Sequence, residues 1–184
     1  MMDHFNFVIR DAIADDIPHC LALEHHYESE HVWRMMIQNT LDGYQINFRR
    51  ERLPRTTSFT HPVDETRLRL ALPSEICYLV AVRKDDPLVI GYLTLRPDPI
   101  HQIGLIQDIV VAQDFRQLGI GTRLLHVARR WTQDNGSKQL MVEVTTKNYP
   151  AIRFAQNQGL QFCGFNDQYF RNQDISVFFG QMLY

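Results

Sequence analysis

The chain has 184 residues, 45% hydrophobic and 22% charged, a composition typical of one globular domain and unlike that of a disordered chain. Its formal net charge of -2 argues against a general nucleic-acid binder and against electrostatic docking to an anionic membrane. The longest apolar stretch, Ile76–Val82, is far shorter than the roughly 20 residues of a membrane-spanning helix.

Two further features favour a cytoplasmic protein. Residues 1–12 lack the basic and apolar regions of a secretory signal peptide. The three cysteines, Cys20, Cys77 and Cys163, are odd in number, far apart in the chain and form no CxxC pair. We therefore expect reduced thiols and a cytoplasmic location.

The N-terminal part of the chain predicts a short strand followed by a helix. Phe7–Arg10 is the expected strand. Asp15 or Asp16 can cap a helix that has Pro18 in its first turn. The segment 40–75 is harder to assign, because it holds six arginines and is broken by Pro54 and Pro62, and we predict an irregular insertion with one or two edge strands.

The pattern becomes regular from Ile76 onward. Two apolar stretches joined by a turn at Arg83–Pro87 predict a β-hairpin, and Leu105–Val111 predicts a further strand. A helix follows Gly119-Ile-Gly121, because apolar residues recur there at three- and four-residue steps. The remaining predicted elements are a strand at Leu140–Thr145, a helix opened by Pro150 and closed by Gly159, and a strand at Ser176–Leu183. Together they indicate a mixed α/β domain.

The turn between the third of these strands and the long helix, Arg116–Thr122, is suited to a phosphate. Its glycines let the backbone approach a ligand closely, and its N–H groups converge at a helix N-terminus. Arg116 can add a charge-assisted contact. The turn is not a Walker A loop, since it has no lysine, and Leu124 stands where a dinucleotide fingerprint needs its third glycine. A glycine-rich helix start that holds no ligand is the alternative.

Four sequence elements in order resemble the GNAT family of N-acetyltransferases. They are a strand ending in DIVV, an RxxGxG turn with its helix, the strand LMVEVT, and NYPAIRFA followed by GLQF. The resemblance runs from about Ile76 to the C-terminus, and Phe7–Glu24 fits the first strand and helix of the family more loosely. Within the family, the chain is most similar to streptothricin acetyltransferases and then to ribosomal-protein alanine acetyltransferases.

The resemblance implies one N-acetyltransferase domain over residues 1–184, with a mixed central sheet of six to seven strands flanked by helices. It also implies acetyl-CoA as donor, an amine as acceptor and no metal. The residues implied to bind the cofactor line the last part of one strand, the turn at the helix start and the next helix: Ile109, Val110, Val111, Arg116, Gln117, Leu118, Gly119, Ile120, Gly121, Thr122, Asn148, Ala151 and Phe154.

The reaction requires a proton acceptor, because an alkyl ammonium with a pKa near 10.4 attacks a thioester only when neutral. Glu143 is the first candidate, since a carboxylate inside an apolar strand is costly without a purpose or partner, and it matches the glutamate base of the ribosomal alanine acetyltransferases. The alternative is that Glu143 faces solvent or pairs with an arginine. Asp108 is the second candidate, for the base or for the acceptor ammonium, unless it only bonds nearby backbone N–H groups. Backbone N–H groups of Asp108–Val111 are the expected donors to the acetyl oxygen.

The chain departs from the family where a tyrosine usually protonates the leaving thiolate, because Ala155 occupies that position. Tyr149 and Tyr169 are nearby in the sequence and could substitute, although a packing role is the alternative for each. A thiol is also a fair leaving group without help, since its pKa is near 8.5.

Acidic residues before and after the first helix suit a cationic acceptor, although a solvated helix face is the interpretation that we favour for them: Asp15, Asp16, Glu24, Glu28, Glu30 and Asp42. Tyr27 and Trp33 could form an aromatic wall or belong to the core. The histidines His25, His26 and His31 match no standard metal site. The arginines of 40–75 could contact a CoA phosphate or an acidic acceptor, or pair with Glu51, Asp64 and Glu65 within the chain.

The sequence thus predicts an acetyl-CoA-dependent N-acetyltransferase acting on a small cationic or antibiotic-like primary amine. A protein N-terminus or lysine is the alternative acceptor. A GNAT-fold sensor or partner subunit that binds acyl-CoA without turnover is the alternative function. A homodimer through Phe178, Phe179 and the Met182–Tyr184 end is a further hypothesis.

Overall fold

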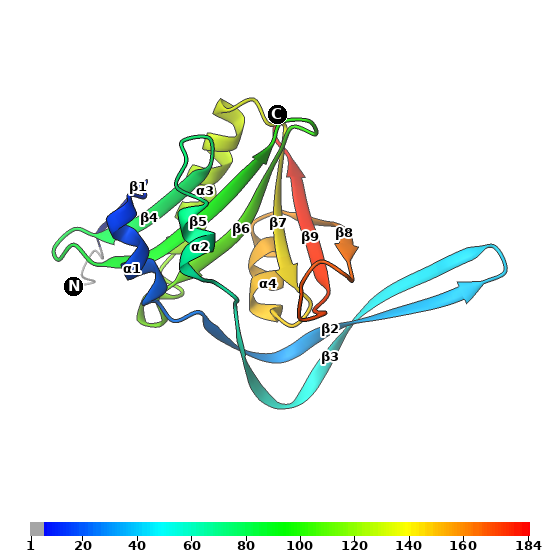
Figure 1. The fold of residues 1–184 in the computed structure, drawn as a ribbon. Helices are drawn as coiled ribbons and strands as arrows, with labels where there is room; N and C mark the ends of the chain where they lie inside the picture. The colour runs from blue at the N-terminus through cyan, green and yellow to red at the C-terminus, as the bar shows by residue number, and fades with distance from the viewer. Residues whose placement is uncertain (1–5) are drawn as a thin grey trace. The chain divides into compact units, whose positions relative to one another are not determined.

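The computed structural model describes residues 6–184, so residues 1–5, the start of the segment searched for a signal peptide, lie outside it. Figure 1 shows the elements in chain order. The strands are β1 (Phe7–Asp11), β2 (His26–Thr40), β3 (Gly43–Thr60), β4 (Cys77–Arg83), β5 (Val89–Asp98), β6 (Ile103–Val111), β7 (Gln139–Thr145), β8 (Gln161–Asn166) and β9 (Ser176–Met182). The helices are α1 (Ile17–Leu21), α2 (Glu65–Arg69), α3 (Ile120–Asp134) and α4 (Tyr149–Asn157). Within the described part of the chain, no helix is long and apolar enough to cross a membrane.

Seven strands form one mixed sheet in the order β1-β4-β5-β6-β7-β9-β8. The pairs from β1 to β6 are antiparallel, and β6 pairs with β7 in parallel. Strands β2 and β3 form a separate antiparallel hairpin. The mixed sheet with its helices confirms the predicted α/β fold.

The chain divides into two compact units, which are described separately. The first unit comprises residues up to 25, residues 62–142 and residues 180–184, and the second comprises 26–61 and 143–179. The boundary lies within β7, between Val142 and Glu143.

In the first unit, helices cover both faces of the strands. Ile17 and Cys20 of α1 and Leu68 of α2 pack with Tyr78 and Tyr92 on one face. Helix α3 packs on β4, β5 and β6 from the other face, with Leu124 and Leu125 fully buried. Each buried leucine or isoleucine contributes about 1.5–3 kcal/mol to stability relative to an exposed one. This packing holds β6 and the start of α3 in place.

Strand β6 carries a bulge at the point where it leaves its parallel neighbour. Thr94 pairs with Asp108 but Leu95 pairs with Ile106, so Gln107 is the extra residue. The pairing of β6 with β7 ends one residue before this bulge, at Ile106 and Val142. In the described pairing, 107–111 therefore has strand β5 on one edge and no paired strand on the other.

The largest difference from the sequence prediction lies in residues 26–75, of which 26–61 belong to the second unit and the rest to the first. The segment 40–75 is not mainly irregular, because it holds the long strand β3 and helix α2, and residues 26–40 form strand β2. The hairpin register shifts between Ser29–Thr57 and His31–Arg52, and Pro54 lies in this irregularity, where no ladder hydrogen bond is needed. Most of the hairpin is exposed on both faces, so its sequence lacks the alternation of a half-buried strand.

An aromatic cluster forms part of the core of the second unit. Trp33 of β2 lies 5.7–6.0 Å, centroid to centroid, from Phe48, Phe162 and Phe179. Phe179 is fully buried in this cluster, so its predicted part in a contact between two copies is wrong. Tyr27 likewise stacks on Phe59 at 5.7 Å, and both aromatic residues considered for an acceptor wall therefore have packing partners.

Candidate functional site

The turn before α3 has the geometry of an anion site. Gly119 is the N-cap of α3 with a φ of 80°, and the first turn closes when the Arg123 N–H donates to the Gly119 carbonyl at 3.0 Å. The N–H groups before Arg123 have no acceptor within the helix, as helix geometry requires. A Cβ atom built on Gly119 meets no heavy atom within 4 Å, so the backbone there is open to a ligand. These features fit a pyrophosphate held by backbone N–H groups.

Arg116 stabilises this turn through hydrogen bonds from its side chain to backbone carbonyl groups. Its Nε donates to the Val111 carbonyl at 2.9 Å, and its Nη2 donates to the Glu24 carbonyl at 3.0 Å. Gln117, the next residue, is held at a φ of 65°, an uncommon conformation for a residue with a side chain. The guanidinium thus fixes the backbone of the turn, and its predicted contact with a phosphate stays a prediction.

The end of β6 offers a second feature of the same unit. Beyond the bulge at Gln107, the β7-facing edge of Ile109, Val110 and Val111 has no paired strand in the described structure. An extended ligand can bind such an edge through main-chain hydrogen bonds. The edge ends at Val111, just before the 3-10 segment Gln113–Phe115, and Arg116 follows that segment directly. The predicted cofactor residues of β6 and of the turn therefore lie along one continuous stretch.

Asp108 lies immediately before this stretch and is buried, with 2% of its surface exposed. Arg67 of α2 donates from Nε to both carboxylate oxygens at 3.1 and 3.2 Å, and Thr94 of β5 donates its hydroxyl to Oδ2. Arg67 also donates to the carbonyl of the bulge residue Gln107 at 3.3 Å. This arrangement makes Asp108 the counter-ion of an arginine that holds the bulge. Its predicted share in acceptor binding or base catalysis stays a prediction.

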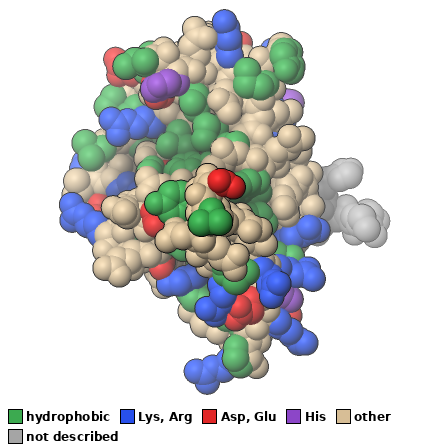
Figure 2. Space-filling view, turned by 90° about the vertical axis from the view of Figure 1, so that its right-hand side faces the viewer, with side chains coloured by type: hydrophobic (Ala, Val, Ile, Leu, Met, Phe, Trp, Pro, Cys, Tyr) green, Lys and Arg blue, Asp and Glu red, His purple; other side chains and the backbone are tan. Residues whose placement is uncertain are grey.

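Arg67 is itself positioned by the start of α2. The Asp64 carboxylate accepts from the Arg67 N–H at 2.7 Å and so caps the helix. The expected pairing of arginines within the chain is confirmed for Arg69 with Glu65, whereas Glu51 pairs with Arg34 of β2. Figure 2 shows Lys and Arg side chains gathered in the lower part of one face. Strand β3 carries four exposed arginines: Arg49, Arg50, Arg52 and Arg55.

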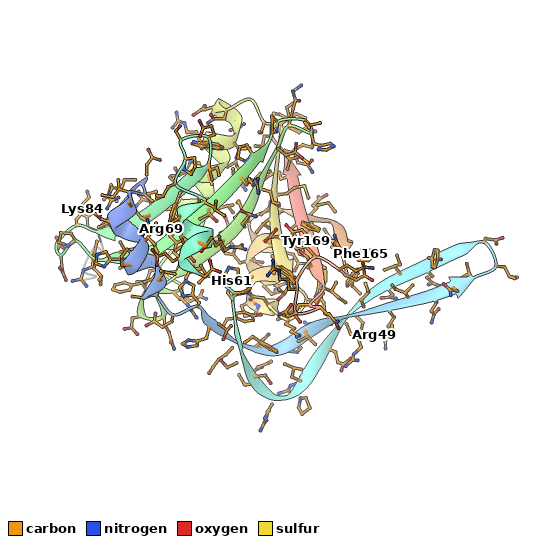
Figure 3. The ribbon with its side chains drawn as sticks, viewed as in Figure 1. Arg49, His61, Arg69, Lys84, Phe165 and Tyr169 are labelled. Carbon is orange, nitrogen blue, oxygen red and sulfur yellow. The ribbon has the colours of Figure 1, made fainter. Side chains whose placement is uncertain are left out.

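Glu143 lies in the second unit and has a different partner. It is 8% exposed, which excludes the alternative that it faces solvent. The Tyr169 hydroxyl donates to its Oε2. Tyr169 comes from the loop between β8 and β9, as Figure 3 shows, and its ring packs edge-on against Phe170 and Phe178. A carboxylate that is buried and held by a neutral donor is suited to act as a base.

The start of α4 is a capped helix terminus. The Asn148 side chain accepts from the Ala151 N–H at 3.0 Å, and Pro150 stands in the first turn. Ala155, at the position of the family's tyrosine, is 1% exposed. Tyr149 accepts a hydrogen bond from Arg50 Nη1 at 3.2 Å. Asn148, Ala151 and Phe154 are half-buried, and their contact with a cofactor stays a prediction.

Two of the acidic residues that the sequence offered for a cationic acceptor have other partners in the structure. Asp16 is 4% exposed and is paired through both its oxygens with Arg10. The Glu24 carboxylate accepts from the Gln113 N–H at 3.2 Å. Asp15, Glu28, Glu30 and Asp42 are exposed. Among residues 6–184, no group of three or more His, Cys, Asp and Glu side chains is placed to hold a metal ion.

Two site residues escaped the sequence reasoning. Arg67 is one of six arginines in the segment 40–75, and Thr94 lies in an apolar strand, so the sequence does not single out either residue. The available signal was Asp108 itself, because an aspartate in an apolar strand requires a cation or hydroxyl donor when buried. Sequence spacing could not identify the donors, since Arg67 and Thr94 lie 41 and 14 residues from Asp108.

Comparisons with known proteins agree with this geometry. The model of the acetyltransferase (GNAT) family matches residues 42–160, more than half of the chain. Streptothricin acetyltransferase A of Bacillus subtilis (strain 168) is 46% identical over 50 residues, or 27% of this chain and 29% of the relative. Streptothricin acetyltransferase of Streptomyces lavendulae is 36% identical over 85 residues, or 46% of this chain and 44% of the relative. The matched segments thus span less than half the length of these relatives.

Solved structures agree on the fold over nearly the whole chain. A nourseothricin acetyltransferase has a TM-score of 0.81 at 20% identity and covers 96% of this chain and 98% of its own. A Bacillus anthracis str. Ames protein assigned as a streptothricin acetyltransferase, solved in complex with acetyl coenzyme A, has a TM-score of 0.77 at 17% identity, covering 97% of this chain and 100% of its own. The family model, the order of the four motifs and the fold lead to one conclusion: the chain belongs to the GNAT family of acetyltransferases.

Proposed function

We propose that the protein is an acetyl-CoA-dependent N-acetyltransferase that acetylates a primary amine of a small cationic acceptor of the streptothricin class. The observation that carries the proposal is the continuous stretch from the unpaired end of β6 to the open Gly119 turn at the start of α3. The acceptor class is supported by the relatives named as streptothricin acetyltransferases.

The residues of the first unit fit two adjoining parts of a coenzyme A molecule. Backbone N–H groups of Arg116–Thr122 suit its pyrophosphate, and the free edge of Ile109–Val111 suits its extended pantetheine arm. When bound, acetyl-CoA supplies the acetyl group as an activated thioester. Asn148, Ala151 and Phe154 would lie along the thioester end of the arm.

The chain's own groups then perform the proton transfers. Glu143 accepts a proton from the acceptor ammonium and so generates the neutral amine that attacks the acetyl carbon. Backbone N–H groups of Asp108–Val111 donate to the acetyl oxygen as it gains charge. The thiolate leaves without a dedicated acid at Ala155, which its ordinary pKa near 8.5 permits.

A second candidate function is acyl-CoA binding without turnover. The observation that favours it is Ala155, which is buried where the family has a tyrosine. The same stretch of β6 and α3 would then bind the cofactor and serve a sensor or partner subunit. A protein N-terminus or lysine is the second acceptor class, and it would require an open groove for a peptide.

A free-thiol release assay with acetyl-CoA tests these proposals. The panel holds streptothricin, polyamines, free amino acids and N-terminal peptides, and calorimetry follows CoA binding in parallel. Thiol release with streptothricin alone supports the proposed function. Release with peptides alone supports the second acceptor class, CoA binding with no release supports the sensor, and no CoA binding overturns all of them.

Location and assembly are also proposals. We propose that residues 1–184 form one N-acetyltransferase domain. We also propose a cytoplasmic location, because the three cysteines are free thiols in the structure. The exposed Met182 and Tyr184 remain the candidate contact for a homodimer. Size-exclusion chromatography with light scattering of the wild type and of Met182→Glu tests that contact, since only a dimer would lose mass.

A further inference from the structure

The hydrogen bond from Tyr169 to Glu143 joins a loop residue to a buried carboxylate in a strand. Glu143 is 8% exposed, and Tyr169 donates its hydroxyl to Oε2. The two residues are 26 positions apart, so the bond depends on how the loop between β8 and β9 folds. A carboxylate has two oxygens that accept independently, and a donor fixed on one of them orients the other.

The loop that carries Tyr169 is stabilised by its own polar contacts. Asn166 Oδ1 accepts from the Gln168 N–H at 2.9 Å just before Tyr169, and the Gln173 N–H donates to the Phe170 carbonyl at 3.0 Å just after it. At the far end of the loop, Lys147 of the β7–α4 connection pairs with Asp174. The loop is therefore stabilised internally on both sides of Tyr169, and its far end is tied to the segment that follows β7.

The ring of Tyr169 is fixed as well. It packs edge-on against Phe170 and Phe178, with centroids 5.1 and 5.6 Å away. Such aromatic contacts restrict ring rotation and aim the hydroxyl. The hydroxyl thus reaches Glu143 from a site that packing and loop geometry set in advance.

We propose that Tyr169 is the positioning residue of Glu143: its hydroxyl holds Oε2, keeps the carboxylate ionised and turns Oε1 toward the acceptor amine. The proposal rests on the proposed function, in which Glu143 takes the proton. A phenol suits this task because it is a neutral donor, so it stabilises the charge without cancelling it. An arginine in its place would compete with the cationic acceptor for the same carboxylate.

The test compares Tyr169→Phe with wild type in the thiol release assay. The variant removes the hydroxyl and keeps the ring, so we expect kcat/KM for the amine to fall about ten- to a hundredfold, with an unchanged KM for acetyl-CoA. The acid limb of the pH profile of kcat/KM should move to higher pH, because the ionised carboxylate loses a stabilising donor. Tyr44→Phe, at a residue 77% exposed near the hairpin tip, is the matched control and should change neither quantity.

A double-mutant cycle separates this proposal from the proposed function. In a Glu143→Gln background, Tyr169→Phe should cost almost nothing more, because both changes act through one carboxylate. An equal loss in both backgrounds, or an unmoved acid limb, overturns the positioning role of Tyr169 while leaving the enzyme assignment intact. A fully active Glu143→Gln instead overturns Glu143 as the base.

A second experiment does not require turnover, so it applies even if the protein is inactive with every amine in the thiol release assay. Carbodiimide modifies carboxyl groups in their protonated form, and mass spectrometry of the peptide containing Glu143 measures its rate. We expect faster modification in Tyr169→Phe than in wild type at the same pH, with Tyr44→Phe unchanged. Equal rates in all three proteins overturn the proposal.

Discussion

Two buried carboxylates, one in each unit, have opposite surroundings. Asp108 of β6 is 2% exposed and faces the guanidinium of Arg67 and the hydroxyl of Thr94. Glu143 of β7 is 8% exposed and takes its hydrogen bond from the phenol of Tyr169. The sequence predicts Glu143 as the first and Asp108 as the second candidate for proton transfer, and their partners in the structure distinguish them further.

The difference teaches which carboxylate can change its charge. A buried carboxylate paired with a half-buried guanidinium is held ionised, and protonating it would leave the arginine without its counter-ion. A carboxylate that takes its hydrogen bond from a tyrosine can accept a proton without stranding the charge of that donor, because a phenol is neutral. We therefore expect Asp108 to support the bulge at the end of β6, and Glu143 stays the proposed base.

The largest expected effect is that of Glu143→Gln on turnover. The amide keeps the shape of the side chain but cannot accept a proton, so kcat/KM for the amine should fall about 10²–10⁴-fold. The affinity for acetyl-CoA measured by calorimetry should not change. Glu75→Gln, at an exposed glutamate in the loop between α2 and β4, is the control and should keep full activity. If Asp108→Asn abolished turnover and Glu143→Gln did not, the comparison would be reversed.

Arg67→Ala should be the most destabilising single change on the Asp108 side. It leaves a buried carboxylate without its cation, which costs roughly 3–5 kcal/mol of unfolding free energy in comparable pairs. Urea denaturation followed by circular dichroism measures the loss. Arg69→Ala, two residues away in an exposed pair with Glu65, should leave the unfolding midpoint nearly unchanged. Equal stabilities for the two variants would show that Asp108 does not need its arginine.

The sequence predicts the parts of the fold that have one buried side. The β4–β5 hairpin, β6, α3, β7, α4 and β9 follow from apolar periodicity, capping residues and closing glycines, and the structure confirms each of them. The β2–β3 hairpin was predicted only in part, as one or two edge strands of an irregular segment, because its exposed strands place polar residues on both faces. Strand β8 at Gln161–Asn166 was also missed, since its residues are largely exposed and do not alternate.

Only those parts of the candidate site that lie within one local sequence motif could be predicted from the sequence. The Gly119 turn and the buried Glu143 could be identified because each lies within a recognisable motif. The partners that decide what each carboxylate does come from distant segments, α2 for Asp108 and the β8–β9 loop for Glu143. Those pairings arise from tertiary packing, and no local pattern specifies them.

Gly119→Ala should sharpen the division between cofactor binding and proton transfer. Alanine at a φ of 80° costs about 1–2 kcal/mol in backbone strain, and its methyl group would narrow the space open to a pyrophosphate. We expect a KM for acetyl-CoA about tenfold higher, with an unchanged pH profile. Gly136→Ala is the matched control, since Gly136 has a φ of 78° and equally open space at the other end of α3. A similar rise in KM for both variants would mean that strain alone is responsible.

Asp16→Asn should have the smallest effect and tests whether an arginine-paired aspartate is always structural. Asp16 resembles Asp108 in being buried beside an arginine, yet it lies at the start of α1 and serves no proposed step. Burial alone would raise its pKa, but the hydrogen bonds from Arg10 and from the Ile13 N–H outweigh burial, so the pKa lies below its ordinary 3.8.

Because the pKa of Asp16 is lowered by folding, its contribution to stability is complete above pH 3.8 and is lost as the pH falls through the folded-state value. Asp16→Asn should therefore lose about 1 kcal/mol near neutral pH, and the gap from wild type should close below pH 3.8. Thermal unfolding of both proteins between pH 7 and pH 3 measures that gap, and kcat/KM at pH 7 should be equal. A gap that persists in acid would mean that Asp16 acts through packing, and Arg67 with Asp108 would then be the only pair in this comparison whose stability depends on charge.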